Sequence, residues 1–256
     1  PHPARAVGIV RTDSRQSERR AQRRARPVRA RAEGDGSANR QGTAMKIAVF
    51  GSSGRTGRLL CERALARGHA VTAHLRNPDK LADLDPAIQR VAGDLGDEAS
   101  IARALEGADI VISALGTTSR KPNSVLSDGT RAILAAMERA GVSHFAAVTS
   151  LGCGDSYGQV NSRLMKLIIK TVAKEIWADK DRQEQAIRQA GEKGGIDYLI
   201  VRPGGLTNGE ANGDWRELRA GQRSKGKQMI ARADVADYIL ARCESLPFGN
   251  DTVMLV

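Results

Sequence analysis

The sequence is poor in cysteine, histidine and aromatic residues, and it contains no long hydrophobic run. Its three cysteines lie far apart, form no CxxC pair and are odd in number, so they indicate neither a disulfide framework nor a zinc site. Only 3% of the residues are aromatic, too few to form a stacking platform for nucleic-acid bases. None of the four histidines lies at metal-ligand spacing to another ligand, so no metal site is predicted. No apolar run approaches the roughly 20 residues of a membrane-spanning helix, and we expect no membrane span.

Acidic residues are also in deficit, and most of the excess positive charge belongs to the N-terminal part of the chain. The whole chain carries a net charge of +11. Residues 1–44 contain 11 Arg and 4 acidic residues and account for +7 of it, whereas residues 45–256 carry +4. The N-terminal segment has almost no large apolar side chains, so it cannot bury enough surface to offset the entropy of ordering. We predict a disordered extension over residues 1–44 and a folded domain over residues 45–256.

Three interpretations of the extension stay open. Its Arg and Ser content is typical of an organelle transit peptide, although such peptides usually contain fewer acidic residues. It is also compatible with an upstream extension ahead of a natural start at Met45, or with a nucleic-acid-binding arm. The expected location is therefore the cytoplasm, or the plastid stroma if residues 1–44 are a transit peptide. We expect no nucleic acid to bind to the domain itself.

From Met45 onward, short apolar runs alternate with helical patterns, which is typical of repeated βαβ units. The expected strands cover residues 46–50, 70–75, 89–91, 110–114, 144–149 and 198–201, and the expected helices cover 58–67, 98–105, 129–140 and about 179–190. We predict an α/β fold with a Rossmann-type, doubly wound parallel sheet in a single domain. Roughly 50 residues follow Val201, so the C-terminal substrate lobe must be small.

The strongest motif is Gly51-Ser-Ser-Gly-Arg-Thr-Gly57, directly between the first expected strand and its helix. Glycines in this position permit a tight turn, close approach of the backbone to a pyrophosphate, and close packing of the helix on the strand. The N-terminus of the helix supplies free N–H groups and the positive end of a dipole. Glycine turns also serve purely structural ends, but the strand–turn–helix context favours a dinucleotide site. The predicted cofactor-binding residues of the motif are Gly51, Ser53, Gly54, Arg55, Thr56 and Gly57.

The end of the second strand indicates which dinucleotide is bound. NAD-binding folds commonly place an acidic residue there, which accepts a hydrogen bond from the ribose 2′-hydroxyl. This strand is followed by Arg76, which pairs with a 2′-phosphate, and Arg55 in the glycine motif adds a second positive group. NADP(H) is therefore favoured, although both arginines are also compatible with a solvated surface. Asp94, after the third strand, is a candidate partner for the adenine amino group or an ordinary turn residue.

Several motifs together resemble a known family in their order and spacing. They are Ile47-Ala-Val-Phe-Gly-Ser-Ser-Gly-Arg-Thr-Gly57, Leu75-Arg76, Gly93-Asp-Leu95, Ala114-Leu-Gly-Thr117, Gly141-Val142, Thr149-Ser150, Val201-Arg-Pro-Gly204 and Ala233-Asp-Val-Ala236. This combination resembles the atypical short-chain dehydrogenase/reductases with an NAD(P)H-binding domain, and within them the biliverdin reductase B/flavin reductase group. The resemblance covers essentially all of Met45 to Val256.

The resemblance implies a role for each matching residue. The glycine motif with Arg76 would hold the diphosphate and the 2′-phosphate, and Asp94 with Leu95 would contact the adenine. Ala114, Leu115 and Gly116 would contact the nicotinamide-side ribose. Thr149, Ser150 and Pro203 would flank the nicotinamide.

Catalytic residues are harder to predict because the usual Tyr-x-x-x-Lys pair is absent. Tyr157 is followed four residues later by Asn161, so a conventional alcohol dehydrogenase mechanism loses support. Lys180 matches a position where many members of the family keep a Lys or His near the cofactor, but it is equally compatible with a solvated helix surface. Ser150 is a candidate hydrogen-bond donor to the substrate or, alternatively, a cap at a strand end. Ser150 and Lys180 are the predicted catalytic residues.

The expected function is that of an NADPH-dependent oxidoreductase that transfers a hydride to a small planar acceptor, such as a flavin, a bilin or a quinone-like ring. Two alternatives are a non-catalytic NADP(H)-binding redox sensor or assembly factor, and a nucleotide-sugar epimerase-like isomerase. Monomer and dimer are both compatible with the sequence. The amphipathic, basic segment 163–174 is expected to pack as a lid or against the core, and a membrane-surface or partner-binding helix is the alternative.

Overall fold

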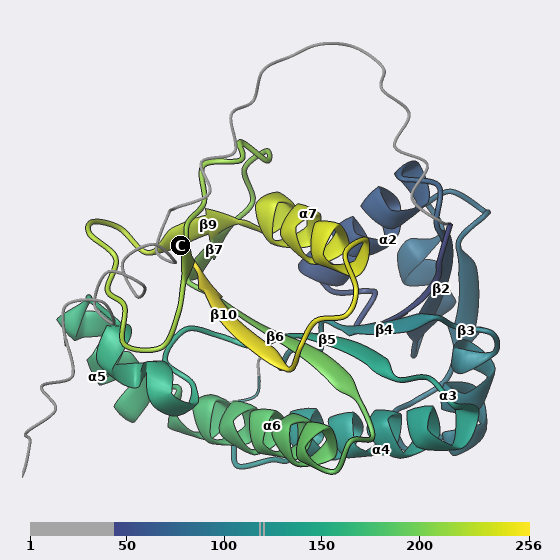
Figure 1. The fold of residues 1–256 in the computed structure, drawn as a ribbon, viewed down its shortest axis with the longest axis horizontal. Helices are drawn as coiled ribbons and strands as arrows, with labels where there is room; N and C mark the ends of the chain where they lie inside the picture. Colours follow the sequence, from purple (N-terminus) through teal and green to yellow (C-terminus); the bar gives the residue numbers. More distant parts are fainter. Residues whose placement is uncertain (1–43, 118, 120) are drawn as a thin grey trace, which may run out of the picture. The chain divides into compact units, whose positions relative to one another are not determined.

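A mostly parallel, eight-stranded sheet forms the centre of the computed structural model, which describes residues 44–117, 119 and 121–256 (Figure 1). The predicted disordered extension lies outside the described residues except for Ala44. Six strands follow the doubly wound order β3-β2-β1-β4-β5-β6, continued by β10 in parallel and β8 in antiparallel. The predicted fold class is therefore confirmed. The strands are β1 (Lys46–Phe50), β2 (Ala70–Leu75), β3 (Gln89–Ala92), β4 (Ile110–Ser113), β5 (His144–Val148), β6 (Asp197–Pro203), β8 (Glu217–Leu218) and β10 (Asp251–Leu255).

Helices cover both faces of the sheet, as Figure 1 shows. On one face α2 (Arg55–Ala66) packs against α7 (Arg232–Cys243). On the other face α4 (Val125–Ala140) packs between α3 (Glu98–Leu105) and α6 (Lys174–Glu192). The shorter helices are η1 (Pro78–Leu81), η2 (Gly154–Gln159) and α5 (Arg163–Lys170). Among the described residues, no helix is long and apolar enough to cross a membrane.

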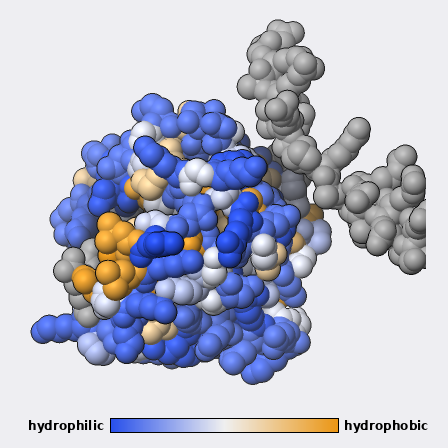
Figure 2. Space-filling view, turned by 90° about the vertical axis from the view of Figure 1, so that its left-hand side faces the viewer, coloured by the Kyte–Doolittle hydropathy of each residue, from blue (hydrophilic) through white to orange (hydrophobic). Residues whose placement is uncertain are grey.

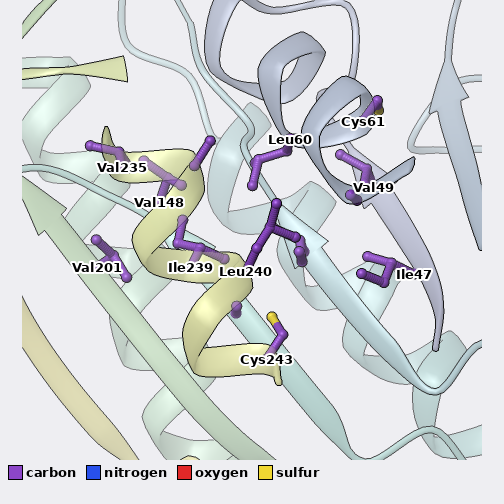
Figure 3. Packing of buried hydrophobic residues seen from close by; sticks show 14 of the residues in the cluster. Ile47, Val49, Leu60, Cys61, Val148, Val201, Val235, Ile239, Leu240 and Cys243 are labelled. Carbon is purple, nitrogen blue, oxygen red and sulfur yellow. The ribbon is translucent and has the colours of Figure 1, made fainter. Parts of the chain in front are cut away.

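The alternation of side chains along the strands divides the core into two layers. In β1, Ile47 and Val49 belong to the cluster under α2 and α7, whereas Ala48 and Phe50 belong to the cluster under α3, α4 and α6. Figure 3 shows the first cluster, in which Leu60 of α2 and side chains of α7 meet the strand residues. Because both faces of each central strand are buried, these strands are continuous apolar runs.

Three of the helices, α2, α4 and α6, begin earlier than expected, and a contact between distant residues accounts for the early start of α4. The α4 helix begins at Val125 instead of residue 129, where the buried carboxylate of Asp179 accepts a hydrogen bond from the Leu126 N–H at 2.8 Å. The Ser127 hydroxyl donates to the same carboxylate at 2.6 Å. The α6 helix that carries Asp179 begins at Lys174, about five residues before the predicted start. The Asp179 carboxylate therefore caps α4 in place of a local capping residue that a sequence pattern would show.

A small lobe follows β6, in the region where a small substrate lobe is predicted. It contains a two-stranded parallel sheet of β7 (Gly205–Thr207) and β9 (Met229–Ala231). Its loop is anchored by Asp234 of α7, whose carboxylate accepts hydrogen bonds from the N–H groups of Asn212 and Gly213 at 3.1 and 2.9 Å. The Ala233-Asp-Val-Ala236 motif therefore has a structural role in fixing this lobe.

Candidate functional site

A cleft of about 1070 Å³ lies at the carboxyl ends of the central strands. In doubly wound sheets this edge, where the strand order reverses between β1 and β4, is the usual ligand site. The loops after β1, β2, β3, β4 and β5 contribute to the lining, together with the first turn of α4 and single residues from α6, β7 and α7. The sequence-predicted residues that line it are Gly51, Ser53, Gly54, Arg55, Thr56, Arg76, Asp94, Leu95, Ala114, Leu115, Gly116, Thr149 and Lys180.

The glycine motif forms the turn from β1 into α2, and two of its glycines are required by the geometry. Gly51 has a φ of +75°, and a Cβ on it would lie 2.6 Å from the carbonyl oxygen of Ala114. A Cβ on Gly57 would lie 2.2 Å from the carbonyl oxygen of Gly51, so α2 packs directly on the turn. No side chain caps α2 at Gly54, and its first turn has no acidic residue. The free N–H groups of this turn are therefore available to an anion.

Three arginines, Arg55, Arg76 and Arg232, give the cleft its positive charge. Within the described part of the chain, no carboxylate lies within 4.0 Å of their guanidinium groups, although ten other arginines and two histidines have such partners. Arg232 is held by Nη1, which donates to the carbonyl oxygens of Leu206 and Thr207 at 3.3 and 3.1 Å. Burial and the positive charge of Arg55 lower the pKa of Arg232. An anion between the two arginines would relieve this repulsion.

One end of the cleft is shaped by the loop after β3. The Asp94 carboxylate accepts a hydrogen bond from the Gly96 N–H at 3.1 Å, so it stabilises the turn while it lines the cleft. Buried His74 also lines this end, and its Nε2 lies 2.9 Å from the Ser100 hydroxyl. Burial lowers the pKa of His74, so the neutral ring is favoured.

The opposite end of the cleft contains Thr149 and Lys180. The Lys180 ammonium donates to the Thr149 carbonyl oxygen at 3.2 Å, and burial lowers the pKa of Lys180. The Thr149 hydroxyl donates to the Glu184 carboxylate at 2.7 Å. None of the three tyrosines, all of which are described, lines the cleft. The Tyr157 hydroxyl instead donates to the Lys166 carbonyl oxygen at 3.4 Å.

A buried ion pair holds Thr149 at this end of the cleft, because its carboxylate also accepts the hydrogen bond from the Thr149 hydroxyl. The guanidinium of Arg202 in β6 forms two hydrogen bonds with the Glu184 carboxylate of α6, one of them from Nε at 2.9 Å. Both side chains are only 2% exposed. Asp155 accepts a further hydrogen bond from Arg202. Although burial opposes the charged form, Glu184 and Asp155 together raise the pKa of Arg202.

Comparison with known proteins agrees with this geometry. Residues 51–245 match the family described as NAD(P)H-binding. The chain belongs to this NAD(P)H-binding family. A nicotinamide dinucleotide is therefore its cofactor, and the fold is that of reductase-type Rossmann proteins.

Individual members and structural neighbours of the NAD(P)H-binding family differ in how closely they match. An uncharacterized chloroplastic protein of Arabidopsis thaliana is 31% identical over 191 residues, which cover 66% of this chain and 62% of that protein, less than two thirds of its length. The structure of an anaerobillin reductase from Escherichia coli O157:H7 is 28% identical with a TM-score of 0.70, and covers 82% of this chain and 96% of its own. A short-chain dehydrogenase/reductase from Veillonella parvula in complex with NADP shares the fold, with 14% identity and a TM-score of 0.68 over 82% of this chain and 94% of its own.

Three predicted site residues lie outside the cleft lining of this NAD(P)H-binding domain. Gly57 is buried beneath the turn and acts through packing. Pro203 is buried at the end of β6, where its carbonyl oxygen accepts from the Leu151 N–H at 2.9 Å. Ser150 is half-buried next to Thr149, and its role as a hydrogen-bond donor to the substrate stays a prediction.

Other residues of the cleft are not predicted from the sequence. Arg232 directly precedes the Ala233-Asp-Val-Ala236 motif, which is the signal that would have led to it. His74 lies in an apolar strand and Leu206 in a short strand of the small lobe, so neither has a local pattern that points to a ligand. The first turn of α4 is placed in the cleft by its contact with Asp179, which is distant in sequence.

Proposed function

We propose that this protein is an NADPH-dependent reductase that transfers a hydride to a small planar acceptor such as a flavin, a bilin or a quinone-like ring. The composition of the cleft is the observation that carries the proposal. It combines a glycine turn for phosphates, three arginines that have no carboxylate partner in the described part of the chain, and a mostly buried lysine. None of its described lining residues is a tyrosine. The tyrosine proton donor of carbonyl reduction is thus missing, whereas a conjugated ring needs mainly to be positioned against the cofactor.

The preference for NADPH rests on the loop after β2. Arg76 follows the last residue of β2 and lines the cleft, where an acidic residue would be needed to accept from a ribose 2′-hydroxyl. A guanidinium has only donors, so it fits a 2′-phosphate and cannot accept from a hydroxyl. Arg76 is therefore the residue that would select NADPH over NADH.

The diphosphate would lie over the first turn of α2. Arg55 and Thr56 are the first two residues of this helix, and their N–H groups belong to its first turn. The side chain of Arg232 comes from α7, and its Nη1 donates to two carbonyl oxygens that hold it in place. A diphosphate there would lie between the positive charges of Arg55 and Arg232, which repel each other in its absence. The sequence-predicted glycine motif and Arg232 would in this way act on the same group.

At the other end, Thr149 and Lys180 are the residues placed to act on the reaction. Bound NADPH supplies a hydride, which carries two electrons and one proton, and the acceptor takes up a second proton. Because burial lowers the pKa of Lys180, its ammonium releases a proton more easily than an ordinary lysine. The Thr149 carbonyl oxygen holds this ammonium in position, and the predicted donor Ser150 is the next residue.

The name of one structural neighbour supports a flat acceptor. The 28% identical Escherichia coli protein is named an anaerobillin reductase, and its aligned region covers 96% of that chain. A bilin-type tetrapyrrole is therefore one of the acceptors to be tested, beside flavins and quinones.

The deciding experiment measures NADPH oxidation at 340 nm by the full chain, with FMN, riboflavin, biliverdin and simple quinones as acceptors. NADPH and NADH affinities are measured in parallel by fluorescence titration. Arg76→Glu should raise the Kd for NADPH by about 10- to 150-fold, because a charge-assisted contact to phosphate is lost, while the Kd for NADH changes little. Lys193→Glu makes the same change of charge on an exposed residue at the end of α6, outside the cleft, and should leave both affinities unchanged.

Each outcome distinguishes the proposal from its alternatives. Turnover of one acceptor that is lost in Arg76→Glu at limiting NADPH establishes an NADPH reductase. Tight NADPH binding without consumption of any acceptor would replace the proposal with a non-catalytic sensor or assembly factor. Equal effects of Arg76→Glu and Lys193→Glu would show that Arg76 has no specific role.

The location of the protein is proposed on separate grounds. The Arabidopsis relative is named chloroplastic, which supports a plastid location with residues 1–44 as a transit peptide over the cytoplasmic alternative. Sequencing the N-terminus of the protein purified from its natural source distinguishes the two. Cleavage near Arg31 supports the plastid, whereas a start at Met45 supports the cytoplasm.

A further inference from the structure

The α5 helix and the turn after it expose an unusual number of apolar side chains. Six large hydrophobic residues are exposed in the described part of the chain, and four of them lie between residues 164 and 172. Their exposed fractions are 67% for Leu164, 40% for Met165, 58% for Leu167 and 50% for Val172. Figure 2 views the side of the molecule on which α5 lies in Figure 1, and shows a hydrophobic cluster in a hydrophilic surround. We call Leu164, Met165, Leu167 and Val172 the α5 patch.

The helix is oriented so that apolar residues point away from the domain. Its buried residue is Ile169, which packs with Leu151 and Val160 in a small satellite cluster. With 3.6 residues per turn, Leu164 and Leu167 lie about 140° and 160° around the helix axis from Ile169. The outer face of an ordinary surface helix would be polar. The predicted packing against the core is therefore made by one face only, while a second apolar face points to solvent.

Basic residues lie beside the patch. The segment 163–174 contains Arg163, Lys166, Lys170 and Lys174 and no acidic residue. Lys166 and Lys170 lie along one flank, where their ammonium groups are 5.8 and 5.2 Å from the centre of the Tyr157 ring. An apolar outer face with cations along one flank is complementary to the surface of an anionic lipid bilayer, where hydrocarbon lies beneath negatively charged headgroups.

Other occupants fit less well. No residue of α5 lines the cofactor cleft, so the patch is not a lid over that cleft in this structure. The N-terminal segment 1–44 carries +7, and would be repelled by the four cations. A second copy of the chain would bring its own four cations against the four cations of the first copy, because a twofold interface places identical surfaces together.

We propose that the α5 patch is a peripheral docking site for anionic lipid bilayers. Leu164, Leu167 and Val172 insert into the boundary between headgroups and acyl chains, and Arg163, Lys166, Lys170 and Lys174 contact the headgroups. The proposal concerns a surface outside the cleft and is independent of the proposed reductase activity.

Flotation of the full chain with vesicles tests the proposal. Vesicles of phosphatidylcholine with 30% phosphatidylglycerol are compared with pure phosphatidylcholine at about 0.1 M salt. Leu164→Ser/Leu167→Ser should weaken binding to the anionic vesicles by about tenfold through lost apolar burial. Met229→Ser, which changes an apolar residue on β9 that is 50% exposed, should change binding less than twofold. The Arg-rich segment 1–44 is present in all these proteins, so its own attraction to the vesicles cancels in the comparison.

A second pair of variants tests the charges. Arg163→Gln/Lys170→Gln should weaken binding by about 25-fold, since each basic residue near such a surface contributes about fivefold. Arg139→Gln/Lys193→Gln removes the same charge at the C-terminal ends of α4 and α6 and should have a much smaller effect. NADPH titration of every variant shows whether the domain is still folded.

Three results would overturn the proposal. The first is an absence of binding to anionic vesicles by the unaltered chain. The second is binding that the two leucine substitutions leave unchanged, which assigns it to another part of the protein. The third is a concentration-dependent dimer in sedimentation that Leu164→Ser/Leu167→Ser dissociates, which identifies the patch as an interface between two copies.

Discussion

Replacing Glu184 with Gln tests the idea that the buried ion pair holds the reactive end of the cleft. The carboxylate accepts hydrogen bonds from Arg202 and from the Thr149 hydroxyl, and the Thr149 carbonyl oxygen in turn holds Lys180. Glu184 and Arg202 are both 2% exposed, so the substitution leaves a buried guanidinium without its main partner. Breaking such a pair typically costs about 3–5 kcal/mol. Asp155 still pairs with Arg202, and we therefore expect the lower end, about 3 kcal/mol.

The loss is measured as the free energy of unfolding in urea, with thermal unfolding as a second measurement. For a domain of this size about 3 kcal/mol corresponds to a fall in Tm of roughly 6–12 °C. Arg188→Gln is the matched control, because its guanidinium lies 3.8 Å from the same carboxylate but is 36% exposed. It should cost less than about 0.5 kcal/mol.

A double substitution separates loss of the pair from loss of a single partner. Glu184→Leu/Arg202→Met removes both charges, and should be less destabilised than the sum of the two single variants, because no buried charge is left unpaired. The reasoning is refuted if Glu184→Gln costs less than about 1 kcal/mol, or if the double variant equals that sum.

Two further predictions concern the cleft. Gly51→Ala should lower the free energy of unfolding by at least about 1–2 kcal/mol and weaken NADPH binding. The φ of +75° at this residue is unfavourable for alanine, and the new Cβ would lie 2.6 Å from the Ala114 carbonyl oxygen. Urea unfolding and NADPH titration measure the two effects, and an unaltered affinity would contradict the prediction. Acidification through the ordinary histidine pKa of 6.5 should destabilise the protein, because burial lowers the pKa of His74 in the folded state. Between that lowered pKa and 6.5 the unfolded state binds more protons than the folded state, so the stability rises with pH over this interval. Tm measured from pH 7.5 to 5 should fall less steeply for His74→Gln, and equal slopes would rule out His74 as the source.

The fold could be predicted because its signals are local. The strand before the glycine motif is a short apolar run followed by a turn that only glycine permits, and the structure places β1 at the predicted residues 46–50. Alternation of such runs with helical patterns was enough to indicate a parallel sheet with two covered faces. The position of Arg76 in the cleft was predictable for the same reason, because it immediately follows a strand whose end has a known position in this kind of sheet.

The end of the cleft that contains Thr149 and Lys180 could not be predicted to the same extent, because it depends on side chains that meet only in the folded chain. Lys180 has no local pattern that separates it from a solvated lysine, and its burial follows from the packing of α6 against α4 and β6. The early start of α4 depends on Asp179, 53 residues from its partner Leu126. A sequence pattern contains the helical period but not which distant carboxylate will cap the helix.

The arginines of the domain show how function differs from stability in the same residue type. Arg202 is buried, and both Glu184 and Asp155 compensate its charge, so it needs no further partner. Arg55 and Arg232 have no such compensation within the described residues, and the charge of Arg55 contributes to lowering the pKa of Arg232. A fold gains nothing from two cations that repel each other, unless a third group of opposite charge binds between them. The unpaired arginines therefore indicate the position of an anion more directly than the glycine turn does, because a glycine turn also has a purely structural explanation.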